Sequence, residues 1–478
     1  MLLLISFLHG LALMGLFLLG IHRTHLLWQF ETHKHQFSTP EHRITSDILV
    51  QIPVYNEANV IESCLMAVSK LRWMTGLVTI QILDDSTDDT STLIAQFISQ
   101  YEGPHSIQHI QRDNRTGYKA GALAAGLSLS KEPFVAIFDA DFQPHAQFLE
   151  ELTAHFYNRP NIGMVQGRWS HSNRDFNRLT RALAIVLDGH FVIEHSGRYL
   201  QDSFFNFNGT AGVWRRECIL DAGGWQWDTI TEDLDLSYRA QLSGWRFIYT
   251  PLVTASAEIP ATMMGMVVQQ FRWAKGTTQT ATKILPTLWG SNEPVRIKLE
   301  GTVHLTANVG YWMTLLLSLV IPFTGFLRWN FDSWWSTLDF GVFVSSFVAL
   351  IIFHQRSQRF IGKWTPFSLV HWQSIIAALI LGVGIALFQS IALLEGLLSP
   401  DATFERTPKS GGHNRIPYTN SPSKRRTHIA YGTLFLSVYS ILGLLYTMHN
   451  NHWLCLPFQL IFSVGYAWVG ASVVREAA

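Results

Sequence analysis

Apolar and polar positions alternate in blocks along the middle of the chain, and the blocks predict strands and helices in turn. Apolar runs of strand length occupy 48–52, 79–83, 134–138 and 162–166. Helical patterns separate the first three runs, near 57–71, 90–101 and 118–130. This alternation predicts a soluble α/β domain over 46–255, with a parallel sheet that carries helices on its faces.

Longer apolar runs lie outside this domain. The first covers residues 2–21 and is followed by His22 and Arg23. Because no basic residue precedes it, we expect a transmembrane anchor at 1–22 with a cytosolic C-terminal end, rather than a cleaved signal peptide. Further apolar stretches occupy 303–327, 338–354, 371–398, 431–447 and 454–473.

Positive charge predicts which loops between these stretches face the cytosol. The polar loops 355–368 and 399–428 are both rich in Lys and Arg, so both are expected inside. A full span at 371–398 would put them on opposite sides. We therefore expect 371–398 to be re-entrant or interfacial, with an ordinary span as the alternative. The remaining predicted segments are amphipathic interface helices at 256–300, transmembrane or re-entrant helices at 301–398, and a transmembrane hairpin at 429–474.

The amino-acid composition indicates that only part of the chain is exposed to water. Of its 478 residues, 48% are hydrophobic and 15% are charged, against about a quarter charged in soluble proteins. The formal net charge is zero, which argues against nucleic acid as a partner. Three scattered cysteines make neither a metal motif nor a disulfide framework, so the main domain is expected in a reducing compartment.

Two carboxylates close the apolar run 134–138. Asp139 and Asp141 point the same way on an extended backbone, because side chains repeat every second residue. The carboxyl ends of strands in open α/β sheets are where ligands bind. Paired oxygen ligands suit Mg²⁺ or Mn²⁺, which also bind substrate phosphates. The alternative is an Asp pair that caps the following turn.

Polar clusters follow the other strands too. Pro53 to Glu57 follows the first run, and Asp84 to Thr90 follows the second. Both clusters are also ordinary turn and helix-capping sequences. Asp84 and Asp85 could in addition hydrogen-bond a nucleobase or ribose. Lys119 opens a helix, where a cation opposes the helix dipole, so a bound phosphate explains its placement better than stability does.

Two further clusters lie near the end of the soluble domain. Thr231-Glu232-Asp233 opens a helical pattern and is either a capping box or the source of a general base. Gln269-Gln270-Phe271-Arg272-Trp273 is typical of an interface helix when taken alone.

Taken in order, these motifs resemble the processive family 2 glycosyltransferases, which include cellulose, hyaluronan and chitin synthases. The series is Pro-Val-Tyr-Asn-Glu, Asp-Asp-Ser, Asp-Ala-Asp, Thr-Glu-Asp, Gln-Gln-x-Arg-Trp and then membrane spans, from about Ile48 to Lys409. The segment from Asn206 to Arg215 is most similar to plant cellulose-synthase-like mannan, glucomannan and xyloglucan-backbone glucan synthases and their bacterial relatives. The resemblance implies a Rossmann-like GT-A α/β fold joined to a helical transmembrane region.

The resemblance also implies a role for each matching residue. Donor-binding residues would be Tyr55, Glu57, Asp84, Asp85, Lys119, Asp139 and Arg272. Asp139 and Asp141 would hold the divalent cation, Mg²⁺ or Mn²⁺. Asp233 would be the general base, with Glu232 beside it. Acceptor-binding residues would be Asn208, Gly209, Gln269, Gln270 and Trp273. Phe404, Thr407 and Lys409 match a gating loop, in which Arg406 replaces the family's Val.

The expected protein is a multi-pass membrane enzyme with a cytosolic catalytic domain, in a bacterial inner or plasma membrane or in the Golgi. It would move a hexose from GDP-mannose or UDP-glucose, with inversion, to a growing β-linked polysaccharide acceptor. Translocation of the polymer would accompany transfer, and spans rich in Trp would line a channel. One alternative is a single-transfer synthase acting on diacylglycerol or ceramide. Another is a non-catalytic scaffold or transporter, against which the intact acidic residues argue.

Overall fold

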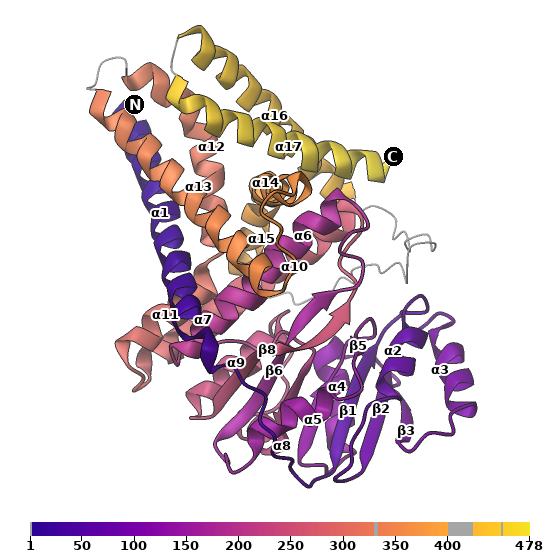
Figure 1. Ribbon diagram of the computed structural model, residues 1–478. Helices are drawn as coiled ribbons and strands as arrows, with labels where there is room; N and C mark the ends of the chain where they lie inside the picture. The colour runs from indigo at the N-terminus through magenta and orange to yellow at the C-terminus, as the bar shows by residue number, and fades with distance from the viewer. Residues whose placement is uncertain (1, 329–332, 400–423, 451–452) are drawn as a thin grey trace.

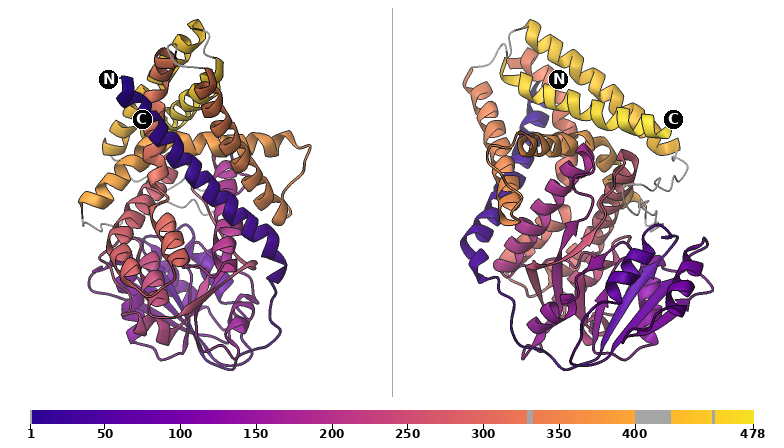
Figure 2. Two further views of the ribbon diagram at one scale, coloured as in Figure 1. Left: turned by 90° about the vertical axis from the view of Figure 1, so that its left-hand side faces the viewer. Right: turned by 45° about the vertical axis from the view of Figure 1, so that its right-hand side comes forward.

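The computed structural model describes residues 2–328, 333–399, 424–450 and 453–478. It has two regions, a sheet domain at one end and a group of long helices at the other (Figure 1). The two views of Figure 2 show the same division, with α10 (Met263–Gly290) running between the sheet and the long helices. The chain therefore places its α/β part and its apolar helices in direct contact.

The sheet of the described chain has eight strands in the order β3-β2-β1-β4-β7-β6-β8-β5. All four predicted apolar runs are strands, and the three predicted helices between them form. The strands are β1 (Ile48–Val54), β2 (Val78–Asp84), β3 (Ser106–Gln111), β4 (Phe134–Ile137), β5 (Gln143–Pro144), β6 (Ile162–His171), β7 (Gly212–Arg215) and β8 (Arg246–Ala257). The helices between the first strands are α2 (Ile61–Val68), α3 (Thr90–Ser99) and α4 (Tyr118–Ser128).

The sheet is mixed, so the prediction of a parallel sheet was wrong for β7 and β5, which run against the other six described strands. Strands β3, β2, β1 and β4 are parallel, as the alternating pattern requires. β7 runs antiparallel to both β4 and β6. Between β6 and β7 the chain makes a long helical excursion and re-enters the sheet at the edge where β6 left it. A strand of four residues carries no sequence signal for its direction.

The core lies on both faces of this sheet. Every residue of β4 is buried, and β1 is buried throughout except for Pro53. These strands are therefore apolar on both faces, as expected of parallel strands covered by helices. Their carboxyl ends meet at one edge, so the residues that follow β1, β2 and β4 are neighbours in space although they are far apart in sequence.

The first helix, α1 (Leu2–His33), is longer than the anchor expected at 1–22. It continues past His22 and Arg23, and both find partners on other helices. His22 Nε2 lies 2.9 Å from Glu300 Oε2, and Arg23 Nε donates to Glu194 Oε1 at 3.2 Å. Basic side chains that would otherwise end a span at the water surface are here part of an intramolecular contact.

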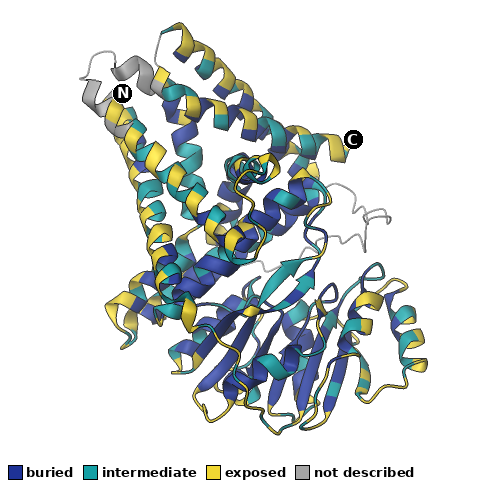
Figure 3. Cartoon of the chain, in the orientation of Figure 1, coloured by how far each residue is buried: buried dark blue, intermediate teal, exposed yellow. Residues whose placement is uncertain are grey.

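The other helices of this region begin with α11 (Val295–Thr306). They continue with α12 (Val309–Arg328), α13 (Ser333–Phe360), α14 (Leu369–Gly384), α15 (Ala386–Leu398), α16 (Lys424–His449) and α17 (Leu456–Ala477). Within the described residues, four helices are long and apolar enough to cross a membrane, or up to six if each bent pair is one span. Their outer faces are largely exposed (Figure 3), and they carry large apolar side chains such as Leu11, Phe435 and Leu442. Exposed apolar surface on this scale is typical of a face that meets either a membrane or another protein.

The segment predicted to be re-entrant is bent. α14 and α15 meet at 46°, as either a broken span or a re-entrant loop would. The choice between these two remains a prediction. The gating-loop residues Phe404, Thr407 and Lys409 lie outside the described residues. So do the side chains of Trp329, Trp334 and Trp335, three of the tryptophans available to line the predicted channel.

Candidate active site

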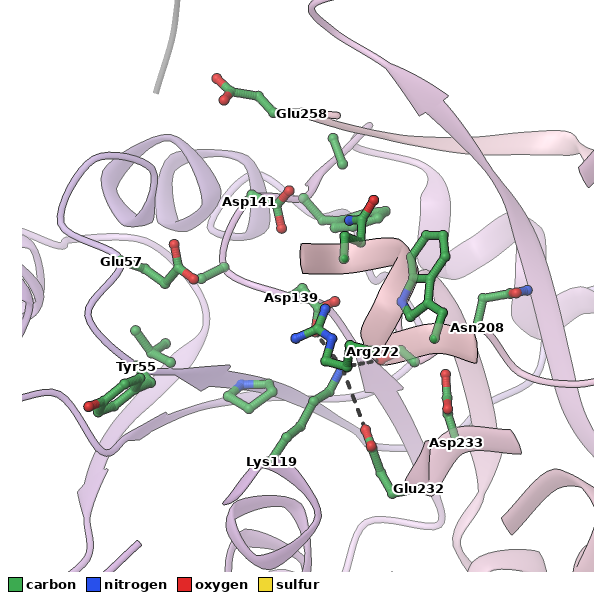
Figure 4. A pocket seen from close by; sticks show the side chains of 18 of the residues that line it. Tyr55, Glu57, Lys119, Asp139, Asp141, Asn208, Glu232, Asp233, Glu258 and Arg272 are labelled. Carbon is green, nitrogen blue, oxygen red and sulfur yellow. Dashed lines mark hydrogen bonds and ion pairs between the residues drawn. The ribbon is translucent and has the colours of Figure 1, made fainter. Parts of the chain in front are cut away.

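One pocket lies at the carboxyl edge of the sheet, between that edge and α10 (Figure 4). It gathers residues that are more than 200 positions apart in the chain. The predicted site residues that line it are Tyr55, Glu57, Asp85, Lys119, Asp139, Asp141, Asn208, Gly209, Glu232, Asp233, Gln269, Arg272 and Trp273.

At one end of the pocket, two arginines hold the residues that follow β1 and β2. Arg112 binds the carboxylate of Asp85 through two nitrogens, at 2.9 and 2.5 Å. The guanidinium of Arg115 lies over the ring of Tyr55, 3.2 Å from its centroid. A bidentate ion pair and a cation–π contact both restrict side-chain motion. This end is therefore a pre-ordered wall with a flat aromatic face and a fixed cation.

The position of Asp84 does not fit the prediction that this residue binds the donor. Its side chain is buried and is not among the described residues that line the pocket. It accepts hydrogen bonds from His109, Ser91 and the backbone of Ser86 at 2.6 to 2.9 Å. Although burial opposes ionisation, these hydrogen bonds outweigh it and lower the pKa of Asp84. Asp84 therefore holds the turn after β2, and Asp85 alone faces the pocket.

Lys119 lies among the carboxylates at the centre of the pocket. Its Nζ is 2.5 Å from Asp139 Oδ1, 2.9 Å from the carbonyl of Gly209 and 4.0 Å from Glu232 Oε1. Burial works against the ammonium, but Asp139 and Glu232 outweigh it and raise the pKa of Lys119. The lysine is thus charged, and it joins the end of β4 to the loop before β7. In the structure Lys119 lies between two acidic groups. Its contact with a donor diphosphate stays a prediction.

The acidic residues at this edge have the chemistry for a hard divalent cation. The buried thiol of Cys64 responds to the negative charge of this edge. Burial raises its pKa, and the nearby carboxylates of Asp141, Asp139 and Glu57 raise it further. Among the described residues, no group of three His, Cys, Asp or Glu could hold a metal ion by itself. Two carboxylates with the remaining positions left to water and phosphate fit Mg²⁺ or Mn²⁺. Asp139 and Asp141 are the residues that would hold it.

Glu232 and Asp233 face the centre of the pocket from the first turn of α9 (Glu232–Leu242). Burial raises the pKa of Asp233 to about 7, and the adjacent Glu232 carboxylate adds to the shift while Lys119 opposes it. Burial also raises the pKa of Glu232. Asp233 is therefore a carboxylate whose pKa matches the working range of a general base near neutral pH.

Gly209 brings the backbone close to this base. Its φ is +77°, a conformation in which side chains other than glycine are strained. A Cβ here would lie 3.0 Å from Asp233 Oδ2 and 3.2 Å from Lys119 Nζ. The glycine thus lets the loop before β7 pass directly beside the acidic pair, with Asn208 at the pocket wall.

Close packing of α10 against α9 joins two motifs that are distant in sequence. A Cβ at Gly276 would lie 2.6 Å from Thr231 Cγ2, so the glycine allows the approach. Thr231 Oγ1 and Thr280 Oγ1 then lie 3.0 Å apart. Arg272 points toward Asp139 (Figure 4). Trp273, the next residue of α10, also lines the pocket. Gln269 also lines the pocket, but Gln270, predicted beside it, is not among the described lining residues.

The C-terminal helix fixes the start of α10. Glu476, in the last turn of α17, accepts hydrogen bonds from the backbone N–H groups of Met263 and Met264 at 2.9 and 2.7 Å. A carboxylate at a helix N-terminus satisfies free donors and complements the helix dipole. The helix that carries Arg272 is therefore capped by a residue from a candidate membrane span.

The lining residues that the sequence did not predict include Arg115, Trp169, His171 and Glu258. Trp169 contacts Phe142 and Trp273, with ring centroids 5.2 and 6.4 Å apart, so the wall near α10 is aromatic. Trp169 and His171 alternate at the end of β6, beyond the predicted end of that strand at 166. Extending the period-two pattern by five residues would have pointed to both.

Comparison with known proteins identifies relatives of the sheet domain. Residues 46–276 match the family described as "Glycosyltransferase like family 2". Glucomannan 4-beta-mannosyltransferase 9 of Arabidopsis thaliana is 35% identical over 299 residues, which cover 59% of this chain and 56% of the relative. Probable glucomannan 4-beta-mannosyltransferase 4 of Oryza sativa subsp. japonica is 42% identical over 242 residues, which cover 50% of this chain and 44% of the relative. The chain thus spans about half the length of these curated relatives.

A solved structure resembles the fold. The mannosyltransferase PcManGT from Pyrobaculum calidifontis, in complex with GDP-Man and Mn²⁺, aligns with a TM-score of 0.50 and 17% identity. The alignment covers 80% of this chain and 99% of that one. At this identity the likeness concerns the fold, which is GT-A, as the motifs implied.

Proposed function

We propose that this chain, which carries a family 2 glycosyltransferase domain of GT-A fold, is a membrane-embedded inverting hexosyltransferase that extends a β-linked polysaccharide. The observation that carries the proposal is that Asp139, Asp141 and Asp233 face one pocket, which lies against α10, and α10 in turn packs on the apolar helices α14 and α15. The donor is a nucleoside-diphosphate hexose. The names of the curated relatives favour GDP-mannose, with UDP-glucose as the alternative.

In this mechanism the donor base and ribose lie along Tyr55 and Asp85, on the wall that Arg112 and Arg115 hold in place. Asp139 and Asp141 would hold a divalent cation, which when bound supplies positive charge to the diphosphate. Arg272 presents a second, permanent charge to the same leaving group from the opposite wall.

Asp233 removes the proton from the acceptor hydroxyl as that oxygen attacks the anomeric carbon. Its partly buried carboxylate, with a pKa of about 7, is half ionised at neutral pH. A single displacement inverts the anomer, so an α-linked donor gives a β-linked product. Trp273 and Trp169 offer flat apolar faces on which a sugar ring of the acceptor stacks.

The test is product analysis with the full-length chain in membranes. Labelled GDP-mannose and labelled UDP-glucose are supplied separately with Mn²⁺, and the label is followed into ethanol-insoluble polymer and chloroform-soluble lipid. We expect polymer that β-mannanase degrades. Label confined to the chloroform phase would indicate a single-transfer glycolipid synthase instead. No consumption of either donor would overturn the proposal and favour a non-catalytic protein.

A further inference from the structure

The connection between α13 and α14 (361–368) leads to exposed apolar side chains at the end of a candidate membrane span. That span covers Phe340–Phe360, and the connection follows it directly. Phe367 is 98% exposed, and Leu369 and Val370, in the first turn of α14, are 69% and 50% exposed. These three residues form an apolar tip in a largely exposed part of the chain (Figure 3). Because exposure of such side chains to water is unfavourable, we expect the tip to meet an apolar medium.

Hydrogen bonds order the chain around the tip, so the exposure of Phe367 is built into the fold. Trp372 Nε1 donates to the carbonyl of Pro366 at 3.1 Å. The backbone N–H of Thr365 donates to His371 Nδ1 at 3.1 Å. Both contacts come from the first turn of α14 and hold the residues immediately before Phe367. The ring of Phe367 is therefore kept outside the packed helices.

Positive charge lies next to the tip and is not balanced by nearby acidic residues in the sequence. Arg356 and Arg359 lie one turn apart near the end of α13, and Lys363 follows the helix; all three are exposed. Arg356 lies 3.7 Å from Glu31 of α1. Arg359 and Lys363 have no ion-pair partner among the residues that the structure describes. No Asp or Glu occurs in the sequence from 340 to 394. A cationic segment therefore borders the apolar tip.

The end of α1 lies beside this end of α13. The rings of Phe30 and Phe360 have their centroids 5.2 Å apart, and Leu27 and Phe353 belong to the same buried cluster. Since α1 is also part of a candidate span, Leu3–Gln36, two candidate spans end at the same level. The cations and the apolar tip follow at that level, where both helices would leave a bilayer.

These features fit a lipid surface better than a protein surface. Lysine is depleted in protein–protein interfaces. Lys, Arg and Trp are instead typical of the boundary between lipid headgroups and acyl chains. Trp364 and Trp372, with ring centroids 5.3 Å apart, lie on either side of the tip in the sequence. The excess of positive charge favours the cytosolic leaflet, which is the leaflet rich in anionic lipid.

We propose that the α13–α14 connection binds anionic phospholipid of the cytosolic leaflet. The apolar tip enters the boundary between headgroups and acyl chains, and Arg359 and Lys363 pair with the negatively charged headgroups. The inference rests on the membrane placement in the proposed function. It adds a dependence on the lipid headgroup that sugar transfer itself does not require.

The experiment counts phospholipids bound to the purified full-length chain by native mass spectrometry. The protein is stripped of lipid in a non-ionic detergent and titrated with phosphatidylglycerol, or with phosphatidylcholine of the same acyl chains. In the wild type we expect the first phosphatidylglycerol to bind at least tenfold more tightly than the first phosphatidylcholine. Arg359→Gln/Lys363→Gln should weaken phosphatidylglycerol binding about fivefold for each cation removed and leave phosphatidylcholine binding within twofold of wild type. Phe367→Ser should weaken both lipids, roughly tenfold, because the buried ring is lost.

The matched control, Lys70→Gln/Lys131→Gln, removes two exposed cations of the sheet domain and should bind both lipids as wild type does. All the replaced side chains are exposed, so each variant should unfold in detergent at the wild-type temperature. Equal affinity of the wild type for the two lipids, unchanged phosphatidylglycerol binding in Arg359→Gln/Lys363→Gln, or the same loss in the control would each overturn the proposal. So would a dimer that Phe367→Ser abolishes, because a second copy of the chain would then occupy the tip. No donor or acceptor is present, so these results are read independently of whether sugar transfer is found.

Discussion

The two sides of the pocket are built in different ways. The side that we assign to the donor comes from the turns after β1 and β2, neighbouring parallel strands. Tyr55 and Asp85 are there because each follows its strand. The side that we assign to the acceptor comes from a loop and two helices, which supply Asn208, Asp233 and Trp273. One of these helices, α10, is held at its start by a contact with α17.

This difference predicts how substitutions on the two sides of the pocket should act. On the donor side the strand register fixes the geometry, so a substitution should remove only the contacts of the replaced side chain. On the acceptor side the geometry depends on packing between remote elements, so a substitution acts through its neighbours as well. Donor-side variants should therefore change donor affinity, and acceptor-side variants should change transfer.

The largest effect is expected for Asp233→Asn. Removal of a general base typically costs about 10²–10⁴-fold in kcat, while donor affinity should stay near wild type because the amide keeps the shape of the side chain. Since burial penalises the ionised carboxylate, the variant should unfold at no lower temperature than wild type at pH 8. Initial rates and thermal unfolding check both parts. A kcat close to wild type would show that Asp233 is not the base.

A smaller but still large loss is expected for Asp139→Ala. The variant removes a proposed cation ligand and leaves Lys119 without its 2.5 Å partner, so donor affinity and kcat should both fall. We expect about a 10²-fold loss of kcat/KM, and EDTA should bring wild type to a similar level. The measurement is the Kd of GDP-mannose at equilibrium, with and without Mn²⁺. Full donor affinity in the presence of EDTA would contradict this assignment of the cation site.

The pH dependence of the wild-type rate should follow Asp233. Its raised pKa, about 7, means that the ionised base predominates above that pH and is lost below it. The rate at saturating substrates should therefore fall about tenfold for each unit below pH 7, the behaviour of one essential base. A pH–rate profile checks this, and a flat profile down to pH 5 would rule out a base with this pKa.

The smallest effects should separate the two residues of the Asp84-Asp85 pair. Asp85→Asn weakens the ion pair with Arg112 at the pocket wall, so we expect roughly a tenfold higher KM for the donor. Asp84→Asn should leave that KM unchanged and lower the free energy of unfolding by about 1–3 kcal/mol. Donor titrations and urea unfolding of both variants are the measurements. Equal KM changes would show that the two residues act as one unit.

Asp84 also gives a stability prediction with a definite sign. Its pKa is lowered in the folded protein, so its contribution is fully present above the unfolded value near 4 and is lost as the pH falls through the lower folded value. The difference in unfolding free energy between wild type and Asp84→Asn should therefore shrink in acid.

The sequence by itself determined strands β1, β2, β4 and β6, the carboxylates at the edge of the sheet and the presence of apolar helices. These follow from short-range rules, because strand periodicity, strand ends and run lengths depend on neighbouring residues. The order of the motifs also located about half of the described residues that line the pocket. Asp84 was misassigned, since adjacent aspartates look alike until their hydrogen bonds are known.

Only the tertiary structure decided the antiparallel entry of β7 and the capping of α10 by Glu476. Each depends on contacts between segments that are far apart in the chain, and neither a four-residue strand nor a glutamate near the end of a helix carries a local signal of its partner. The raised pKa of Asp233 belongs with them, because burial by remote elements, rather than residue type, gives a carboxylate the proton affinity of a base.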